Sequence, residues 1–514
     1  MGGLIKKNLV LILALLGLID ASYLTYKHFF APIEICFASP FSDCGAVLKS
    51  EYSVMFGLPV ALWGAVHYLA VIYWFLGIRI LKSRLFGRML FLQTFIGVLF
   101  SVYYTYLQFY VIKALCPYCL ASAVISFALY FVSRFSFYEE YRRFSLIKIW
   151  FFYQIIAKPV FFILPADFVH SQAMFWADVI GRVSFIKIIL SRIFVFKSKA
   201  LTQKIEGQIF ENPIGLAAGY DYEGAFTQIL PAIGFGFETV GTISFNPCEG
   251  NSRPRLGRLP KSKSLLVNKG FRNKGAIWMI KKLKKQKFEF PLGISIGRTN
   301  NESTSTLKNA VEDIFKSFEL WEKSKIEFKY YELNISCPNL KKGVDFYQPA
   351  NLSVLLNRLN LLKTAKPIFV KMPIELDNAS IVKILETLKD YRFIKGVIFG
   401  NLQKDRQDPA FDLSEISKAG QGNFSGLPTY KKSNELIKLT YKKYKERFVI
   451  IGCGGVFSAQ DAYVKIRSGA SLIQMITGLV FEGPQIVSIT NRDLVELLTK
   501  DGYKNIKEAV GADC

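Results

Sequence analysis

The N-terminal third of the chain consists of long apolar stretches separated by short polar segments. The stretches run over residues 8–29, 57–78, 89–111 and 119–138. Each is long enough to cross the ~30 Å hydrocarbon core of a bilayer as a helix. The first stretch lacks the small-residue cleavage site of a signal peptide and leads into a multi-span pattern. The pattern therefore predicts four transmembrane helices.

Beyond residue 211 the pattern changes to short apolar runs separated by polar stretches of helix length. Eight such runs lie near residues 213–218, 238–243, 291–296, 329–334, 367–371, 395–400, 447–452 and 471–475. Strands that alternate with helices favour an α/β fold, here a (β/α)8 TIM barrel. Polar residues and glycines follow the ends of the runs, where barrels of this kind build their sites.

The intervening residues 139–210 are rich in Phe, Ile, Lys and Arg. One or two amphipathic helices lying on the bilayer would explain this composition, with a plain connecting helix as the alternative. The predicted fold is multidomain: a four-helix transmembrane bundle, then a TIM barrel with an N-terminal amphipathic helical extension. The expected domains are a transmembrane domain over 1–140, a linker with membrane-associated helices over 141–205, and the barrel over 206–514.

Basic residues outnumber acidic ones, which gives a formal net charge of +25. No nucleic-acid-reading motif accompanies this excess, so anionic lipid headgroups are the favoured partner. Basic residues flank one end of every span: Lys6, Lys7, Arg79, Lys82, Arg84, Arg88, Arg142, Arg143 and Lys148. By the positive-inside rule, both termini and the barrel are cytoplasmic and the other loops face outside. The expected localisation is the cell (inner) membrane, multi-pass.

Four cysteines lie in the apolar third, as two unequal pairs. Cys36 and Cys44 share one predicted loop, and Cys116 and Cys119 form a C-x-x-C at a helix boundary. A C-x-x-C is a thiol/disulfide device or half of a metal site. Structural disulfides remain an alternative, and zinc is disfavoured because the pairs flank different spans. An N-terminal helix position would stabilise a thiolate near Cys119.

The same region resembles the vitamin K epoxide reductase family of quinone-linked disulfide catalysts, over roughly residues 10–138. The resemblance rests on GLIDASYLTYKH (17–28), the cysteine loop, FGLP (56–59) and CPYC (116–119). It implies that Cys36 and Cys44 take electrons from a thioredoxin-like thiol protein on the outer face. Cys116 would accept these electrons, Cys119 would face a quinone, and Ser50 would lie near that quinone.

The barrel half contains no histidine after His170, which removes His-based triads and most metal sites. No metal is expected. Glycines gather late in this half, in the loops after the sixth to eighth runs, and Thr477-Gly478 follows the last run. Barrels hold a phosphate with backbone N–H groups in such loops, and that of flavin mononucleotide (FMN) is the economical occupant. Ordinary turn glycines are the alternative.

This half resembles dihydroorotate dehydrogenase of the membrane-associated, quinone-linked (class 2) type, over about 160–514. The motifs are NPIGLAAG (212–219), GFGFETVGT (234–242), RPR (253–255), NISCPN (334–339) and IGCGG (451–455). The resemblance implies pyrimidine biosynthesis: FMN takes a hydride from dihydroorotate, and ubiquinone or menaquinone accepts the electrons.

The resemblance also assigns residues to roles. The flavin contacts would be Ala218, Gly219, Thr242, Asn334, Lys371, Gly426, Gly454, Gly455 and Thr477. Lys371 would place a cation near the flavin's anionic edge. Asn334, Asn339 and Asn401 would hydrogen-bond the pyrimidine, and Cys337 would remove the carbon-bound proton.

Four positions depart from the quinone-linked pattern. Cys337 stands where that class has serine, and Tyr222 replaces a lysine that contacts orotate. Arg272 stands at a substrate-binding asparagine, where it could bind a carboxylate bidentately, and Leu402 replaces a threonine. The leading hypothesis is a bifunctional membrane oxidoreductase in which both halves reduce quinone. The alternatives are a flavin barrel with another substrate, or a weakly active flavin-binding module attached to the disulfide catalyst.

Overall fold

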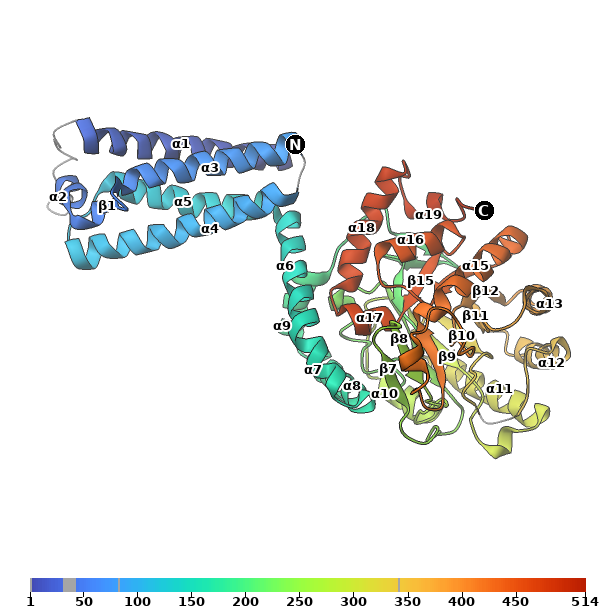
Figure 1. Ribbon diagram of the computed structural model, residues 1–514. Coiled ribbons are helices and arrows are strands. Elements are labelled where there is room, and N and C mark those ends of the chain that lie inside the picture. Colours follow the sequence, from blue (N-terminus) through green and yellow to red (C-terminus); the bar gives the residue numbers. More distant parts are fainter. Residues whose placement is uncertain (1, 31–42, 82–83, 341–342) are drawn as a thin grey trace. The chain divides into compact units, whose positions relative to one another are not determined.

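A computed structural model describes residues 2–30, 43–81, 84–340 and 343–514. The chain divides into two compact units, Met1–Ile147 and Lys148–Cys514. Figure 1 shows the elements of each unit.

The first unit is built from long apolar helices: α1 (Gly2–Phe30), α3 (Val60–Leu81), α4 (Arg84–Tyr106) and α5 (Pro117–Ser136). Helix α1 packs on α3 and α5, and α4 packs on the same two helices (Figure 1). Gly17 allows α1 to lie close to the Tyr68 ring of α3. Any residue with a Cβ at this position would place that atom 2.3 Å from the ring. The outward side chains are also apolar, as is usual where lipid replaces water.

Short elements connect these helices. Helix α2 (Cys44–Lys49) and a 3-10 turn (Glu51–Ser53) precede the hairpin β1 (Val54–Met55) and β2 (Leu58–Pro59). A π-helical turn (Leu107–Ile112) extends α4. The backbone N–H of Asp43 donates to the carbonyl of Leu115 at 3.0 Å, which fixes α2 beside the start of α5.

Within the described residues, five helices are long and apolar enough to cross a membrane. They are Asn8–Phe30, Val60–Leu81, Leu85–Ile112, Pro117–Phe135 and Arg142–Ile163. The first four correspond to the predicted spans. The fifth lies in the segment for which the sequence predicted surface helices, so the number of candidate spans differs from the expected four.

The second unit contains a closed barrel of parallel strands, which confirms the predicted TIM barrel. Its strands are β5 (Ile214–Leu216), β6 (Phe237–Ile243), β9 (Leu292–Ile296), β10 (Tyr330–Asn334), β11 (Ile368–Met372), β12 (Ile394–Phe399), β14 (Val449–Cys453) and β15 (Leu472–Met475). They match the eight apolar runs because strands of a parallel barrel are buried on both faces. Gly293 leaves room for the Tyr330 ring, which a Cβ would approach to 2.1 Å.

Helices surround the barrel, and smaller sheets close its ends. The helices are α10 (Ala276–Leu283), α11 (Leu307–Lys323), α12 (Pro349–Asn360), α13 (Asn378–Lys389), α14 (Leu413–Ile416), α15 (Tyr430–Tyr444), α16 (Ala459–Arg467), α17 (Thr477–Glu482), α18 (Ile486–Lys500) and α19 (Ile506–Ala509). One antiparallel sheet has the order β13 (Asn423–Gly426), β8 (Ser264–Val267) and β7 (Leu256–Leu259). A hairpin of β3 (Gln203–Ile205) and β4 (Gln208–Phe210) precedes the barrel.

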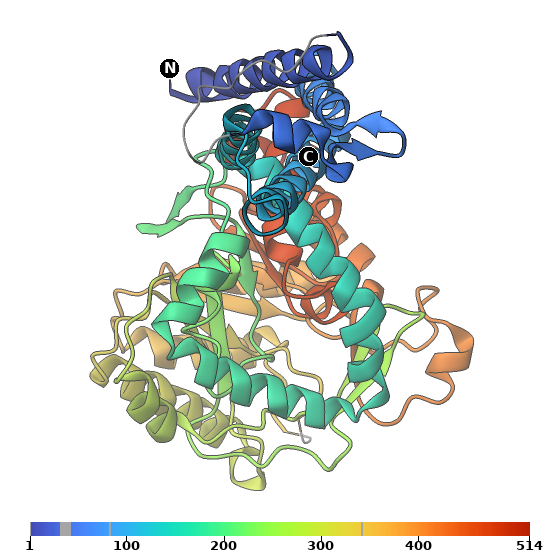
Figure 2. The same ribbon diagram turned by 90° about the vertical axis from the view of Figure 1, so that its left-hand side faces the viewer.

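The helical extension before the barrel is present. It comprises α6 (Tyr138–Phe152), a π-helical turn (Tyr153–Ala157), α7 (Lys158–Ile163), α8 (Ala166–Gly181) and α9 (Ser184–Phe194). Figure 2 shows α7 to α9 as teal and green coils across the barrel. Phe168, Trp176 and Phe185 are exposed on α8 and α9, whereas Met174, Ala177 and Phe194 are buried. The two helices are therefore amphipathic.

Polar side chains of the extension attach it to α17. The Tyr153 hydroxyl donates to the carbonyl of Val480 at 2.6 Å, and Gln154 Nε2 donates to that of Phe481 at 2.9 Å. The Trp150 indole N–H donates to Glu482 at 3.2 Å. Residues 150–154 are thus held by the barrel.

Candidate functional site

A cavity of about 450 Å³ opens between α8 and the carboxyl ends of the barrel strands. Its outer lining is apolar and includes Phe161, Phe162 and Ala173. The inner lining contains eleven residues with predicted roles or departures: Ala218, Gly219, Tyr222, Thr242, Arg272, Asn334, Cys337, Asn339, Lys371, Asn401 and Leu402. The structure thus brings together residues that are up to 184 positions apart (from 218 to 402).

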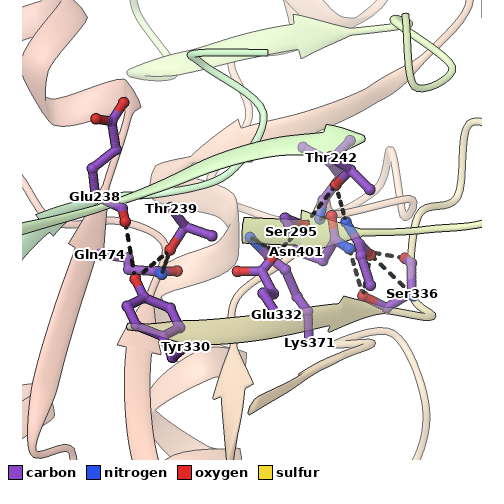
Figure 3. Close-up of polar contacts among 12 residues, drawn as sticks. Glu238, Thr239, Thr242, Ser295, Tyr330, Glu332, Ser336, Lys371, Asn401 and Gln474 are labelled. Atoms are coloured by element: carbon purple, nitrogen blue, oxygen red, sulfur yellow. Dashed lines mark hydrogen bonds and ion pairs between the residues drawn. The ribbon is translucent and has the colours of Figure 1, made fainter. Parts of the chain in front are cut away.

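A chain of polar contacts fixes the cation at the end of β11. Lys371 is buried, and its ammonium nitrogen lies 3.9 Å from the Glu332 carboxylate. Ser295 Oγ donates to that carboxylate at 2.8 Å and lies 2.9 Å from Thr242 Oγ1. Asn334 Nδ2 donates to Thr242 Oγ1 at 2.8 Å. Figure 3 shows the side chains of Lys371, Glu332, Ser295 and Thr242 converging from neighbouring strands. Lys371, Thr242 and Asn334 are therefore held by one network.

The other two predicted asparagines are also oriented by the protein. Asn401 Nδ2 donates to the carbonyl of Ser336 at 2.9 Å and to its hydroxyl at 2.6 Å (Figure 3). Asn339 Nδ2 donates to the carbonyl of Val267 at 2.9 Å, and Asn339 Oδ1 accepts a hydrogen bond from Asn423 Nδ2 at 2.6 Å. Asn423, on β13, was not predicted. Because β13 pairs with β8 only in three dimensions, no local sequence pattern marks it.

Cys337 is a free thiol in the loop after β10. Burial raises its pKa to about 11, while the Asn339 N–H and the charges of Lys371, Lys404 and Arg298 act in the opposite direction. The thiol is therefore protonated at neutral pH, and nearby cations stabilise the thiolate when it forms. The fraction of Cys337 present as thiolate, the form that can accept a proton, therefore rises with pH.

A smaller hollow of about 80 Å³ adjoins the cavity through Ala218 and Lys371. It is lined by the predicted Gly426, Gly454, Gly455 and Thr477. Gly454 has φ +93°, and a Cβ there would lie 2.3 Å from Thr429 Oγ1. This tight, glycine-lined hollow suits a phosphate contacted by backbone N–H groups. The cavity and hollow together fit a flavin mononucleotide.

Tyr222 and Arg272, two of the departures from the family pattern, form a cluster with His170. Arg272 Nη1 donates to the Tyr222 hydroxyl at 3.1 Å. The His170 ring on α8 lies 5.5 Å from the Tyr222 ring at an interplanar angle of 22°. Leu402 also lines the cavity. His170 precedes Tyr222 by 52 positions along the chain (from 170 to 222), so no local sequence pattern joins it to this group.

In the first unit, the described cysteines lie close together. Cys44 is disulfide-bonded, Cys116 and Cys119 are free, and Cys36 lies outside the described residues. Cys44 and Cys116 pack in one buried cluster with Val47. Cys116 caps α5, and its sulfur accepts the N–H of Cys119 at 3.3 Å. The backbone N–H of Cys116 donates a hydrogen bond to Gln108 Oε1 at 2.9 Å.

A cavity of about 410 Å³ lies among the helices of this unit. Cys119 and Ser50 both line it, as do Tyr104 and His67. Ser50 Oγ donates to the carbonyl of Val47 at 2.8 Å, and Gln93 Nε2 lies 3.0 Å from His67 Nδ1. Gln93 and Tyr104 were not predicted. Polar residues within apolar helices are the signal that could have found them.

Comparison with known proteins identifies both units. The model of the dihydroorotate dehydrogenase family matches residues 200–498, more than half of the 514-residue chain. The model of the vitamin K epoxide reductase family matches residues 8–134.

Relatives and solved structures agree with the first match. A dihydroorotate dehydrogenase (quinone) of Trichodesmium erythraeum is 36% identical over 379 residues, covering 70% of this chain and 98% of the relative. One from Haloarcula marismortui is 30% identical, with the same coverage of both chains. The crystal structure of Eimeria tenella dihydroorotate dehydrogenase with ferulenol has a TM-score of 0.59 at 25% identity, covering 68% of this chain and 96% of that one. The chain therefore belongs to the dihydroorotate dehydrogenase family and joins a barrel of that family to a vitamin K epoxide reductase family domain.

Proposed function

We propose that the barrel oxidises dihydroorotate to orotate with bound FMN and delivers the electrons to a quinone. The observation that carries this proposal is the cavity beneath α8 that brings together Lys371, Cys337 and the asparagines, with the glycine hollow adjoining it. The relatives named dihydroorotate dehydrogenase (quinone) support the same reaction. No observation favours a different substrate.

Each group in the cavity has a defined part in this reaction. Bound FMN supplies the hydride acceptor. Gly454, Gly455 and Thr477 would hold its phosphate, and Lys371 would place a positive charge at its ring. Asn334, Asn339 and Asn401 would orient the pyrimidine, with Arg272 at its carboxylate. The Cys337 sulfur, as thiolate, would take the proton from carbon.

The quinone would enter between the helices of the extension. Apolar side chains of α7 and α8 line the outer cavity, and the exposed faces of α8 and α9 are apolar as well. Such a face suits partition into a bilayer, where ubiquinone or menaquinone is dissolved. The anionic substrate requires the polar inner part.

Purified full-length protein tests this function directly. Flavin content is measured first, and then dihydroorotate-dependent reduction of a quinone analogue. We expect about one flavin per chain together with turnover. Bound flavin without turnover would reject the proposed substrate and leave another substrate or a flavin-holding module.

We further propose that the first unit oxidises external thiols and reduces quinone. Two observations carry this proposal. Cys44 packs against Cys116, and Cys119 lines the cavity among the helices of the first unit. A thioredoxin-like dithiol would be oxidised to a disulfide as it reduces the Cys36/Cys44 pair. Exchange would then reduce the Cys116/Cys119 pair. That pair would return to a disulfide as the quinone gains two electrons and two protons. Ser50 would lie beside the quinone.

The thiol reaction is tested with the full chain and a reduced partner dithiol. The substitution Cys119→Ala should stop quinone reduction by that dithiol. Survival of the activity would contradict the relay. The alternative of purely structural disulfides predicts no dithiol-dependent quinone reduction in either form.

For the membrane arrangement, we propose four spans forming a transmembrane bundle in the cell (inner) membrane. The domains would be 1–140, 141–205 and 206–514, with both termini and the barrel cytoplasmic and the cysteine relay outside. The hydrogen bonds of residues 150–154 to the barrel support a docked rather than a spanning fifth helix, because lipid offers no such partners.

Reporter fusions separate four spans from five. A reporter joined after residue 140 and one joined after residue 205 should both be cytoplasmic. If Arg142–Ile163 crossed the membrane, the two reporters would lie on opposite sides.

A further inference from the structure

Lys269 follows β8 and extends into the barrel cavity, where no role has been assigned to it. Its ammonium donates to the carbonyl of Gly219 at 3.2 Å. It also lies 4.5 Å from the centre of the Tyr222 ring. Gly219 and Tyr222 both belong to the loop after β5. Lys269 is therefore fixed against the same loop as the groups expected to contact flavin and substrate.

Lys269 and Arg272 approach Tyr222 together. The Arg272 guanidinium carbon is 5.7 Å from the ring centre, and its Nη1 donates to the hydroxyl. Within the part of the chain that the structure describes, neither cation forms an ion pair with a carboxylate. Two cations beside one aromatic ring in an otherwise largely apolar cavity leave a positive charge that a bound anion would compensate.

The Nε2 atom of His170 does not take the place of a bound anion as an acceptor for the Lys269 ammonium. His170 Nε2 lies 2.9 Å from the carbonyl of Tyr220 and 3.4 Å from the Lys269 ammonium. The shorter distance places the proton of Nε2 toward the carbonyl, so this nitrogen cannot accept from Lys269 at the same time. Gly219 takes one ammonium proton, and at least one further donor of Lys269 is available to a ligand.

We propose that Lys269 and Arg272, which both contact Tyr222, form the subsite that binds the carboxylate of the substrate. This inference rests on the proposed function and deepens it. The family has a lysine where this chain has Tyr222. Here the positive charge would come from Lys269 and Arg272 in the loop after β8, and Tyr222 would hold both side chains in place. Carboxylates are bound most strongly by charged donors of this kind.

The surroundings of Lys269 give the subsite a pH dependence. The pKa of Lys269 is lowered to about 7, chiefly by burial; Asp167 and Asp221 act to raise it, and Arg272 and Arg255 contribute to the lowering. Burial also lowers the pKa of His170 well below its usual value, so that ring stays neutral. Affinity for an anion should therefore fall as pH rises through 7, because Lys269 loses its proton.

The test is titration of the flavin absorbance of the full-length protein with orotate at pH 6 and pH 8. Lys269→Met should weaken orotate binding roughly tenfold or more at pH 6, as loss of a charged hydrogen bond predicts. It should leave flavin content and the quinone KM unchanged. Lys274→Met is the matched control, because Lys274 lies in the same segment but pairs with Glu223 at 3.2 Å. That control should bind orotate normally.

Two further measurements keep the result decisive. Lys269→Arg should retain affinity at pH 6 and lose the weakening at pH 8, since arginine does not titrate there. Uracil, which lacks the carboxylate, should bind the wild-type protein and Lys269→Met alike. Unchanged orotate affinity in Lys269→Met, or a change in quinone KM alone, would overturn the inference. If the wild-type protein bound no orotate, the proposed substrate itself would be wrong.

Discussion

At the scale of single residues, the environment of Cys337 changes the acid–base chemistry expected of a thiol. Burial raises its pKa to about 11, and three cations with one backbone N–H oppose that rise. A sequence motif identifies the residue but cannot give this balance, because Lys371, Lys404 and Arg298 come from other strands and loops. At neutral pH only a small fraction is thiolate.

We therefore expect the kcat for dihydroorotate, measured at saturating substrate, to rise between pH 6 and pH 9. The reason is that the thiolate fraction grows as pH approaches the pKa. Cys337→Ala should lower kcat by about 100-fold or more, as removal of a general base usually does. A flat pH profile, or a kcat of the alanine variant close to that of the wild-type protein, would show that another group takes the proton. Flavin content is the control for folding.

At the same scale, the sequence does not show how the residues that depart from the family pattern are grouped in space. The sequence shows Tyr222, Arg272 and Leu402 as separate departures at positions expected to contact the substrate, of which Arg272 could bind a carboxylate. In three dimensions Tyr222 and Arg272 are hydrogen-bonded, and Lys269 and His170 join them. The cluster forms through contacts between the extension and two barrel loops, so no linear pattern could reveal it.

At the scale of elements, the eight barrel strands could be predicted and the antiparallel sheet could not. The barrel strands are buried on both faces and read as apolar runs. Strands β7 and β8 contain Gly257, Arg258 and Ser264, and have only four residues each, so they resemble loop sequence. The extension was predicted as amphipathic helices, but its first part is apolar enough to qualify as a fifth candidate span.

The loop after β14 carries a second prediction. Gly454→Ala should lower flavin content strongly and reduce the free energy of unfolding by about 1 kcal/mol or more, because φ is +93° and the added Cβ would meet Thr429. Gly420→Ala is the control, since nothing lies within 4 Å of a Cβ there. Flavin absorbance per chain and denaturant unfolding measure the two effects. Full flavin content in Gly454→Ala would remove this loop from the cofactor site.

At the scale of the whole molecule, two oxidoreductase units share one chain. The proposed topology places the thiol relay and the barrel on opposite faces of the membrane. We expect no direct transfer between thiols and flavin, and a common quinone pool as the only link. The order of the domains could be read from the sequence, whereas the side of each active site still depends on the number of spans.

Paired variants test this independence. Cys119→Ala should abolish dithiol-dependent quinone reduction and leave dihydroorotate turnover within about twofold of wild type. Cys337→Ala should do the reverse. Both activities are measured on the same membranes with the same quinone analogue. Loss of both activities in either variant would mean that the two units depend on each other.

The hydrogen bonds of Tyr153, Gln154 and Trp150 to residues 480–482 tie the membrane-proximal segment to α17. The first residue of α17, Thr477, lines the glycine hollow. A six-residue helix thus stands between the anchor and the phosphate of the prosthetic group. A barrel that begins after residue 165 should therefore release its flavin faster on dilution than the full chain, which flavin fluorescence would record. Attachment to the bilayer would then act as a retention device for the cofactor as well as a route to quinone.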